Sequence, residues 1–262
     1  MELNEMNYFS HEADVAFFSA SQIKSFKRCE ASTMAQLRGL YRRPESTALA
    51  VGQYVDAALT GDLDEWCGCH PEIRKRDGTL KADFLQASEM VGRANRDDMF
   101  MSFMEGEHQA ILKAPILGGY WFKAKFDVLG PDRIVDLKTV RDLRSQYLPG
   151  QGRVDFATAW DWPLQMAIYQ KIYEEIEGVR LPCYLAVITK ETPADIRIVQ
   201  IEQERMDAEI AWLEQVLPRY EAVKNGDITP ERCEMCEYCR DSRVLFEPEM
   251  LGDFDENGGI TE

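Results

Sequence analysis

The sequence of 262 residues has little positive charge and contains no long apolar run. It carries 30 lysines and arginines against 46 acidic residues, so its formal net charge is −16. This balance argues against a general nucleic-acid binder, because contacts to phosphates depend on Lys and Arg. No stretch of eighteen apolar residues is present, which excludes a membrane-spanning helix. Neither an internal repeat nor a low-complexity segment is visible.

The amino-terminal stretch MELNEMNYFSHEADVAFF lacks both the basic leader and the apolar core of a secretory signal. We therefore expect an intracellular, cytoplasmic protein. In such a reducing compartment the seven cysteines are expected to be thiols or metal ligands, and not a disulfide framework.

The charges are distributed unevenly along the chain. Residues 244–262 contain acids and no Lys or Arg, whereas residues 74–81 contain four basic side chains. The net charge is therefore a poor guide to the local field. Residues 23–43 have Glu30 as their single acid and carry the basic side chains Lys24, Lys27, Arg28, Arg38, Arg42 and Arg43.

The periodicity of apolar residues predicts helices first, then strands, and then both in alternation. This order predicts an α/β domain with a mixed β-sheet flanked by helices. A loop rich in Gly and aromatic residues is expected over residues 145–162, and a bend at Pro218. The expected helices cover residues 19–40, 48–61, 80–104, 163–177 and 206–226, and the expected strands cover residues 108–116, 118–130, 133–140, 183–190 and 195–202.

The run IVDLKTV at residues 134–140 places an acid and a base inside a strand of β-branched residues. Side chains alternate along a strand, so Asp136 and Lys138 share one face, as Lys125 and Asp127 do in the preceding strand. If the two strands form a hairpin, Asp127 and Asp136 converge. Such charges on a half-buried surface are costly unless they are balanced, which Mg²⁺ or Mn²⁺ would do. The alternative is a structural Asp–Lys ion pair at a sheet edge.

Two further pairs of residues stand on predicted helices. In WPLQMAIYQKIY, Gln165 and Tyr169 are four residues apart and therefore lie on one helical face. In VGQYVDAAL, Gly52 and Asp56 have the same spacing. The alternatives are that Tyr169 is a core aromatic residue and that Asp56 is an acid on a helix surface.

Asp127, a turn and then residues 136–138 together resemble the signature of the PD-(D/E)xK nuclease superfamily. Gln165 and Tyr169 are similar to the QxxxY motif of its RecB-like branch. VGQYVDAAL is similar to the GxxxH motif of RecE-type exonucleases, with Asp56 in place of the histidine. The motifs occur in the order of that family, and the resemblance to phage-encoded RecE-like nucleases extends over nearly the whole chain.

The resemblance implies one nuclease domain over residues 1–262, with its core at about 48–202 and an acidic tail at 244–262. It implies an exonuclease that uses Mg²⁺ or Mn²⁺ and resects linear duplex DNA, including single-stranded ends, for phage recombination and repair by strand annealing. The partners it implies are DNA and an annealing protein of the RecT type. The location would then be the host cytoplasm, and a homo-oligomer is left open.

The resemblance also assigns roles to residues of this chain. Lys138, Gln165 and Tyr169 would act with Asp127 and Asp136 in catalysis. Independently of the resemblance, the uneven charge leads us to expect that DNA approaches over the basic residues of the amino-terminal helix and of the 74–76 cluster. The cation would be held by Asp56, Asp127, Asp136 and the carbonyl of Leu137.

The stretch ERCEMCEYCR contains Cys233, Cys236 and Cys239, a spacing that lets three thiolates face one metal centre and matches the start of bacterial ferredoxin motifs. In RecB-like relatives, one cysteine before the nuclease core and three after it hold a [4Fe-4S] cluster, and Cys29 matches the first. Zn²⁺ bound by four thiolates is the second possibility, and free cysteines the third.

The remaining cysteines carry weaker signals. Cys67, Cys69 and His70 have no evident partner, so we expect loop residues there, and Cys183 is expected in the core. Two functions compete with the nuclease. One is a catalytically silent DNA-binding or DNA-mimicking protein, which the net charge leaves open but which would have no use for Lys138 beside two acids. The other is an interaction module stabilised by its metal cluster.

Overall fold

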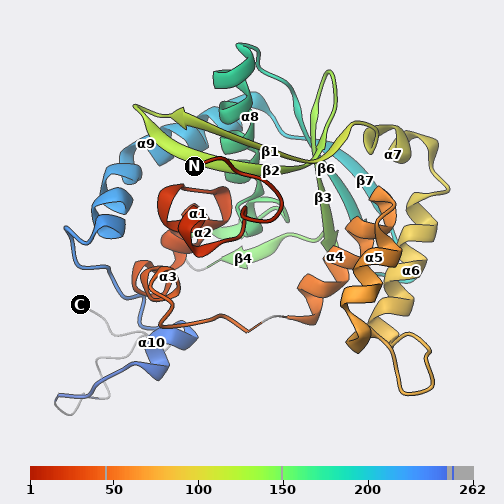
Figure 1. Ribbon diagram of the computed structural model, residues 1–262, viewed down its shortest axis with the longest axis horizontal. Coiled ribbons are helices and arrows are strands. Elements are labelled where there is room, and N and C mark those ends of the chain that lie inside the picture. Colours follow the sequence, from red (N-terminus) through yellow and green to blue (C-terminus); the bar gives the residue numbers. More distant parts are fainter. Residues whose placement is uncertain (45, 149, 247–249, 251–262) are drawn as a thin grey trace.

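Five strands form the central sheet of the computed structural model, which describes residues 1–44, 46–148, 150–246 and 250. Their order in space is β1-β2-β3-β6-β7 (Figure 1). β3 and β6 are parallel, and all other neighbours are antiparallel, so the sheet is mixed, as predicted. The strands are β1 Glu107–Ile116, β2 Tyr120–Leu129, β3 Ile134–Val140, β6 Cys183–Thr189 and β7 Ile196–Gln200.

Helices pack on both faces of this sheet (Figure 1). On one face, α8 (Trp162–Glu177) connects the parallel strands β3 and β6 and packs against α9 (Gln203–Asn225) and α2 (Ala20–Arg28). On the other, α4 (Thr47–Thr60) contacts β3 and α6 (Ala82–Ala94) contacts β6. Successive residues of β3 and β6 belong to two different apolar clusters, so both faces of the central strands are buried.

Shorter elements complete the described chain. The predicted loop at residues 145–162 is in part a hairpin of β4 and β5, and a short helix within the cysteine run was not predicted. No described helix combines the length and the apolar character needed to cross a membrane. These elements are α1 His11–Ala16, α3 Glu30–Leu37, α5 Leu63–Cys69, α7 Asp98–Phe103, α10 Glu237–Asp241, β4 Gln146–Leu148, β5 Gly152–Val154 and the 3₁₀ turns Pro71–Ile73 and Thr158–Trp160.

Two of the predicted helices are interrupted. The prediction of one helix over residues 19–40 is wrong, because the backbone of Cys29 is extended (φ −169°, ψ 109°) and separates α2 from α3. The helix predicted over residues 80–104 stops before Asp97, whose carboxylate accepts the N–H of Phe100 and caps α7. At both points a side chain satisfies an N–H group of the following helix, which competes with continuing the previous one.

The amino-terminal segment runs along β2. Phe18 forms a parallel bridge with Phe122. The neighbouring Lys123 is only 1% exposed. Its ammonium pairs with Asp14 at 2.7 Å and donates to the carbonyl of Tyr8 at 2.5 Å. These contacts hold the segment against the part of β2 that does not pair with β3.

Candidate active site

Three acidic residues from three elements lie near one another where β2 and β3 separate. Asp127 lies on β2, Asp136 on β3 and Asp56 on α4, and their charges influence one another. Asp136 is 1% exposed, and the other two are half-buried. Burial, and then the nearby Asp136, raises the pKa of Asp127 well above its usual range. Burial, opposed by Lys125 and aided by Asp136, raises the pKa of Asp56 to about 6.

The separation of the two strands shapes the site. β2 and β3 form the predicted hairpin but pair through only two residue pairs next to the turn. Beyond these pairs, Asp127 Oδ2 takes the place of a backbone acceptor and receives the N–H of Leu137 at 2.9 Å. The N–H and C=O of one strand residue point to the same side, so the Leu137 carbonyl faces the same gap.

One carboxylate oxygen at this point, Asp56 Oδ1, is buried without a polar partner among the described residues. The other oxygen of Asp56 accepts the side-chain amide of Gln109 at 2.9 Å, and the buried Asp136 Oδ2 is paired with the ammonium of Lys138. Buried polar atoms are almost always satisfied. A hard divalent cation would satisfy Asp56 Oδ1, and the donor set of three carboxylates and one carbonyl is of the kind that Mg²⁺ or Mn²⁺ prefers.

Lys138 lies beside Asp136, as the alternation along the strand predicts. Its ammonium pairs with the Asp136 carboxylate and lies 5.7 Å from the ring centroid of Trp162. Burial alone would lower the pKa of Lys138, but the carboxylates of Asp136 and Asp127 outweigh it and raise this pKa. The side chain therefore keeps its positive charge at neutral pH, next to the acidic group.

α8 turns Gln165 toward the carboxylates. Gln165 Nε2 donates to Asp136 Oδ1 at 2.7 Å and to the hydroxyl of Tyr169 at 3.4 Å. Its Oε1 accepts the ammonium of Lys24, from α2, at 2.8 Å. Gln165 is 8% exposed, so these bonds fix the orientation of its amide and, through it, the position of Asp136.

Tyr169 is both a core aromatic residue and a neighbour of the acidic group. Its ring packs against Phe126 with centroids 4.8 Å apart, and it is 9% exposed. Burial, followed by the charge of Asp136, raises the pKa of Tyr169 well above its usual range. Its hydroxyl therefore keeps its proton.

The sequence did not reveal three residues of this site. Lys24 was predicted only as part of a basic helix. In the structure it is partly buried, and this burial, together with the charge of Lys138, lowers its pKa to about 8. Gln109 has φ 56°, a conformation that is rare for a residue other than glycine within a strand. Trp162 lies beneath Lys138. Residues of these types have many ordinary roles, and only their proximity in the fold distinguishes them.

Two large cavities adjoin this group of residues, the first through Asp56 and the second through Trp162 alone. One, of 570 Å³, is bordered by Asp56, Gln109 and Lys125 together with the ring of Trp66. The other, of 750 Å³, lies at the end of β3 and is lined by several aromatic rings and one arginine. The residues of this second cavity that bear on the argument are Arg141, Tyr147, Phe156, Trp160 and Trp162.

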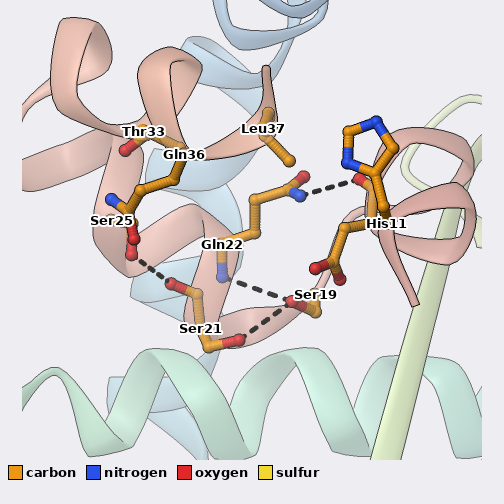
Figure 2. A pocket seen from close by; sticks show the side chains of 9 residues that line it. His11, Ser19, Ser21, Gln22, Ser25, Thr33, Gln36 and Leu37 are labelled. Atoms are coloured by element: carbon orange, nitrogen blue, oxygen red, sulfur yellow. Dashed lines mark hydrogen bonds between the residues drawn. The ribbon is translucent and has the colours of Figure 1, made fainter. Parts of the chain in front are cut away.

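A third cavity, of 290 Å³, lies among α1, α2 and α3 (Figure 2). Gln22 donates its side-chain amide to the carbonyl of Asp14 at 2.9 Å and its backbone N–H to Ser19 Oγ at 3.2 Å. The hydroxyls of Ser19 and Ser21 share a hydrogen bond of 3.0 Å. These polar groups satisfy one another and cap α2, so they do not form a candidate catalytic site.

Four cysteines form a separate group at the end of α2, as predicted. Their sulfur atoms all lie within 4.8 Å of one another. The group joins one residue near the start of the chain to the run near its end, so a metal could connect the two segments. Its members are Cys29, Cys233, Cys236 and Cys239.

The other cysteines do not join a group of this kind in the described part of the chain. Cys67 and Cys69 belong to α5, so the expectation of a loop is wrong there. His70 ends that helix, and its ring stacks on Trp66 at 4.0 Å between centroids. Cys183 is fully buried, which confirms the prediction of a core residue.

Known proteins are similar to this chain in sequence and in fold. The family described as "PDDEXK-like domain of unknown function (DUF3799)" matches residues 19–242, and the chain belongs to this family. A crystal structure named "Putative exonuclease" from Eubacterium rectale has 37% identity, covers 98% of this chain and 99% of its own, and superposes with a TM-score of 0.93. The fold is therefore that of the PD-(D/E)xK nucleases. No curated protein matches.

Proposed function

We propose that this protein is an exodeoxyribonuclease that depends on Mg²⁺ or Mn²⁺ and degrades linear double-stranded DNA. The observation that carries the proposal is the convergence of Asp56, Asp127 and Asp136 beside Lys138. One oxygen of these carboxylates, Asp56 Oδ1, is buried without a polar partner among the described residues. Membership of a PDDEXK-like family and the similarity to a protein named as an exonuclease support a nuclease.

The chain positions each proposed ligand of the cation through another residue. Asp127 is held by the N–H of Leu137, Asp136 by Gln165 and Asp56 by Gln109. When bound, the cation supplies a Lewis acid for the phosphate and a water molecule of lowered pKa. The proposed ligands are Asp56, Asp127, Asp136 and the Leu137 carbonyl.

Lys138 and Tyr169 would act on the substrate. The ammonium of Lys138 is charged and fixed beside Asp136, where it can stabilise negative charge that develops on the phosphate or on the attacking water. Tyr169 keeps its proton, so its hydroxyl remains a donor. We assign Gln165 and Tyr169 to orienting the phosphate or the terminal nucleotide, and not to binding the metal.

The approach of DNA is proposed from the charges and the cavities. Residues 74–76 are exposed, and Lys24 and Lys27 both reach α8 or the turn before it. The aromatic rings around the 750 Å³ cavity offer faces on which unpaired bases could stack. The acidic tail at 244–262 is expected to point away from DNA, although residues 247–249 and 251–262 lie outside the described residues.

We further infer that the enzyme resects DNA ends for strand annealing in phage recombination, with an annealing protein of the RecT type as its partner. Support comes from the order of the motifs and from the position of the helical motif, whose Asp56 lies with the other carboxylates. Such a role would place the protein in the host cytoplasm and is compatible with a homo-oligomer.

Purified protein tested on linear duplex DNA and on a closed circle of the same sequence would test the proposal. Mg²⁺ or Mn²⁺ should permit release of nucleotides from the linear DNA alone, and EDTA should stop it. Asp136→Asn should be inactive, whereas Glu174→Gln, on the outer face of α8, should match the wild type.

Degradation in EDTA, or by Asp136→Asn, would contradict the proposed chemistry, and cleavage of the circle would contradict the exonuclease. DNA binding without any cleavage would instead favour the catalytically silent protein that the net charge of −16 leaves open. End-labelled substrates in the same assay would report the polarity.

A further inference from the structure

We propose that a single tetrahedral Zn²⁺ ion, and not the [4Fe-4S] cluster implied by the family resemblance, is bound by Cys29, Cys233, Cys236 and Cys239. The two alternatives use the same four thiolates. They differ in how far apart the four sulfur atoms must stand, and this distance can be compared with the structure.

The sulfur atoms lie close enough for one ion. All four are within 4.8 Å of one another, and Cys239 Sγ lies 3.6 Å from Cys29 Sγ and 4.0 Å from Cys233 Sγ. Zn–S bonds of about 2.3 Å in a tetrahedron place the sulfurs about 3.8 Å apart. In a [4Fe-4S] cluster each thiolate binds a different iron, which pushes the sulfurs to about 6 Å. The observed spacing leaves no room for four irons.

Backbone N–H groups already point at the sulfurs. Cys236 N–H donates to Cys233 Sγ at 3.3 Å, and Cys239 N–H donates to Cys236 Sγ at 3.4 Å. Cys29 Sγ accepts the N–H of Ser32 at 3.4 Å. Such bonds fix the orientation of metal ligands and stabilise their negative charge. Two of these bonds, those from the N–H groups of Cys239 and Ser32, also cap α10 and α3, so they fix the start of each helix and a ligand at the same time.

The surroundings of the site fit a structural ion. Four thiolates and one Zn²⁺ carry a net negative charge, and Arg232 lies beside them and donates to the carbonyl of Cys239 at 2.7 Å. The two chain segments also bind each other directly. Ala31 N–H donates to the carbonyl of Glu231 at 2.9 Å, and Glu231 N–H donates to the carboxylate of Glu30 at 2.8 Å. These hydrogen bonds align the two segments through contacts that do not involve a metal.

Measurement of bound metal in the full-length protein tests the inference independently of nuclease activity. The protein should be purified without oxygen from cells supplied with iron and cysteine, so that a cluster could form and survive. We expect one zinc per chain, no acid-labile sulfide and no visible colour. Exchange for Co²⁺ should give the intense visible bands of tetrahedral thiolate coordination.

Four irons with sulfide, or no metal at these thiols, would overturn the proposal, and one iron without sulfide would overturn the choice of zinc. Cys233→Ser should lose the zinc, whereas Cys69→Ser, at an exposed thiol outside the group, should retain it. If Cys233→Ser is insoluble, a thiol reagent can be titrated into the wild type. Release of the zinc should then accompany modification of four of the seven cysteines, and zinc retained after all seven react would refute the site.

Discussion

Replacement of Lys138 by Met should separate catalysis from metal binding. Methionine keeps an apolar stem beside Trp162 but removes the ammonium that pairs with the buried Asp136. Loss of one group that stabilises charge in the transition state typically costs about 10²–10³ in rate, and we expect a loss of this size at saturating Mg²⁺. The raised pKa of Lys138 means that it is charged throughout the neutral range, so the deficit should not change between pH 6 and 9.

The same substitution should have the opposite effect on metal affinity. Asp136 would lose its positive neighbour, and leaving one partner of a buried ion pair alone costs about 3–5 kcal/mol of stability. A bound cation would restore the balance, so Mg²⁺ should stabilise Lys138→Met against urea more than it stabilises the wild type. The half-saturating Mg²⁺ concentration should be unchanged or lower.

Initial rates on linear duplex DNA at several Mg²⁺ concentrations, with urea unfolding in parallel, would provide these values. Lys171→Met is a matched control on α8, because its ammonium pairs at 3.0 Å with Glu174 on the partly exposed side. Such surface pairs contribute about 0.2–1 kcal/mol, and its rate should equal that of the wild type. A Lys138→Met rate near that of Lys171→Met, or a rate restored by more Mg²⁺, would refute the assigned role.

Four further predictions concern Tyr169, Asp56 and the pair Arg42 and Arg43. Tyr169→Phe keeps the ring against Phe126 but removes the hydroxyl, so turnover should fall while Mg²⁺ affinity measured by calorimetry stays unchanged; equal loss of both would make the residue structural. Because the pKa of Asp56 is raised to about 6, this group is protonated at lower pH, and Mg²⁺ affinity should weaken as pH falls through about 6 in the wild type but less so in Asp56→Asn. The raised pKa also means that folding is favoured by protonation, so the free energy of unfolding without metal should rise as pH falls through the same range; a flat profile would contradict the burial of Asp56. Arg42 and Arg43 changed together to Glu should weaken DNA binding and flatten its dependence on salt, because fewer counterions are released, and an unchanged slope would place the DNA path elsewhere.

The parts of the fold that could be predicted correctly are those determined by the pattern of apolar and polar residues within a single element. The strand at residues 134–140 has buried residues on both faces, and its alternation places Asp136 and Lys138 together. The break at Cys29 could not be predicted in the same way. Its backbone leaves the helix where its sulfur meets Cys239, and that partner is distant in the sequence. The hairpin at residues 146–154 was missed because its strands are only three residues long.

The same distinction holds for the site. Asp127 and Asp136 lie on consecutive strands joined by a tight turn, so their convergence follows from hairpin geometry. Gln165 could be placed on the correct helical face from its spacing to Tyr169. Lys24 and Gln109 reach the group only through the packing of α2 and the unusual backbone of β1. No periodicity along the chain contains that information.

The attachment of α2 through Cys29 has a consequence for the order in which the protein is made. A growing chain folds from its amino end, and all the candidate catalytic residues, from Lys24 to Tyr169, leave the ribosome before Cys233. Cys29 must wait for a partner 210 residues later in the chain. Until that partner emerges, the helix that presents Lys24 to Gln165 lacks the anchor that we propose the metal provides. Synthesis of the last segment, and not of the catalytic strands, would then determine when the nuclease matures.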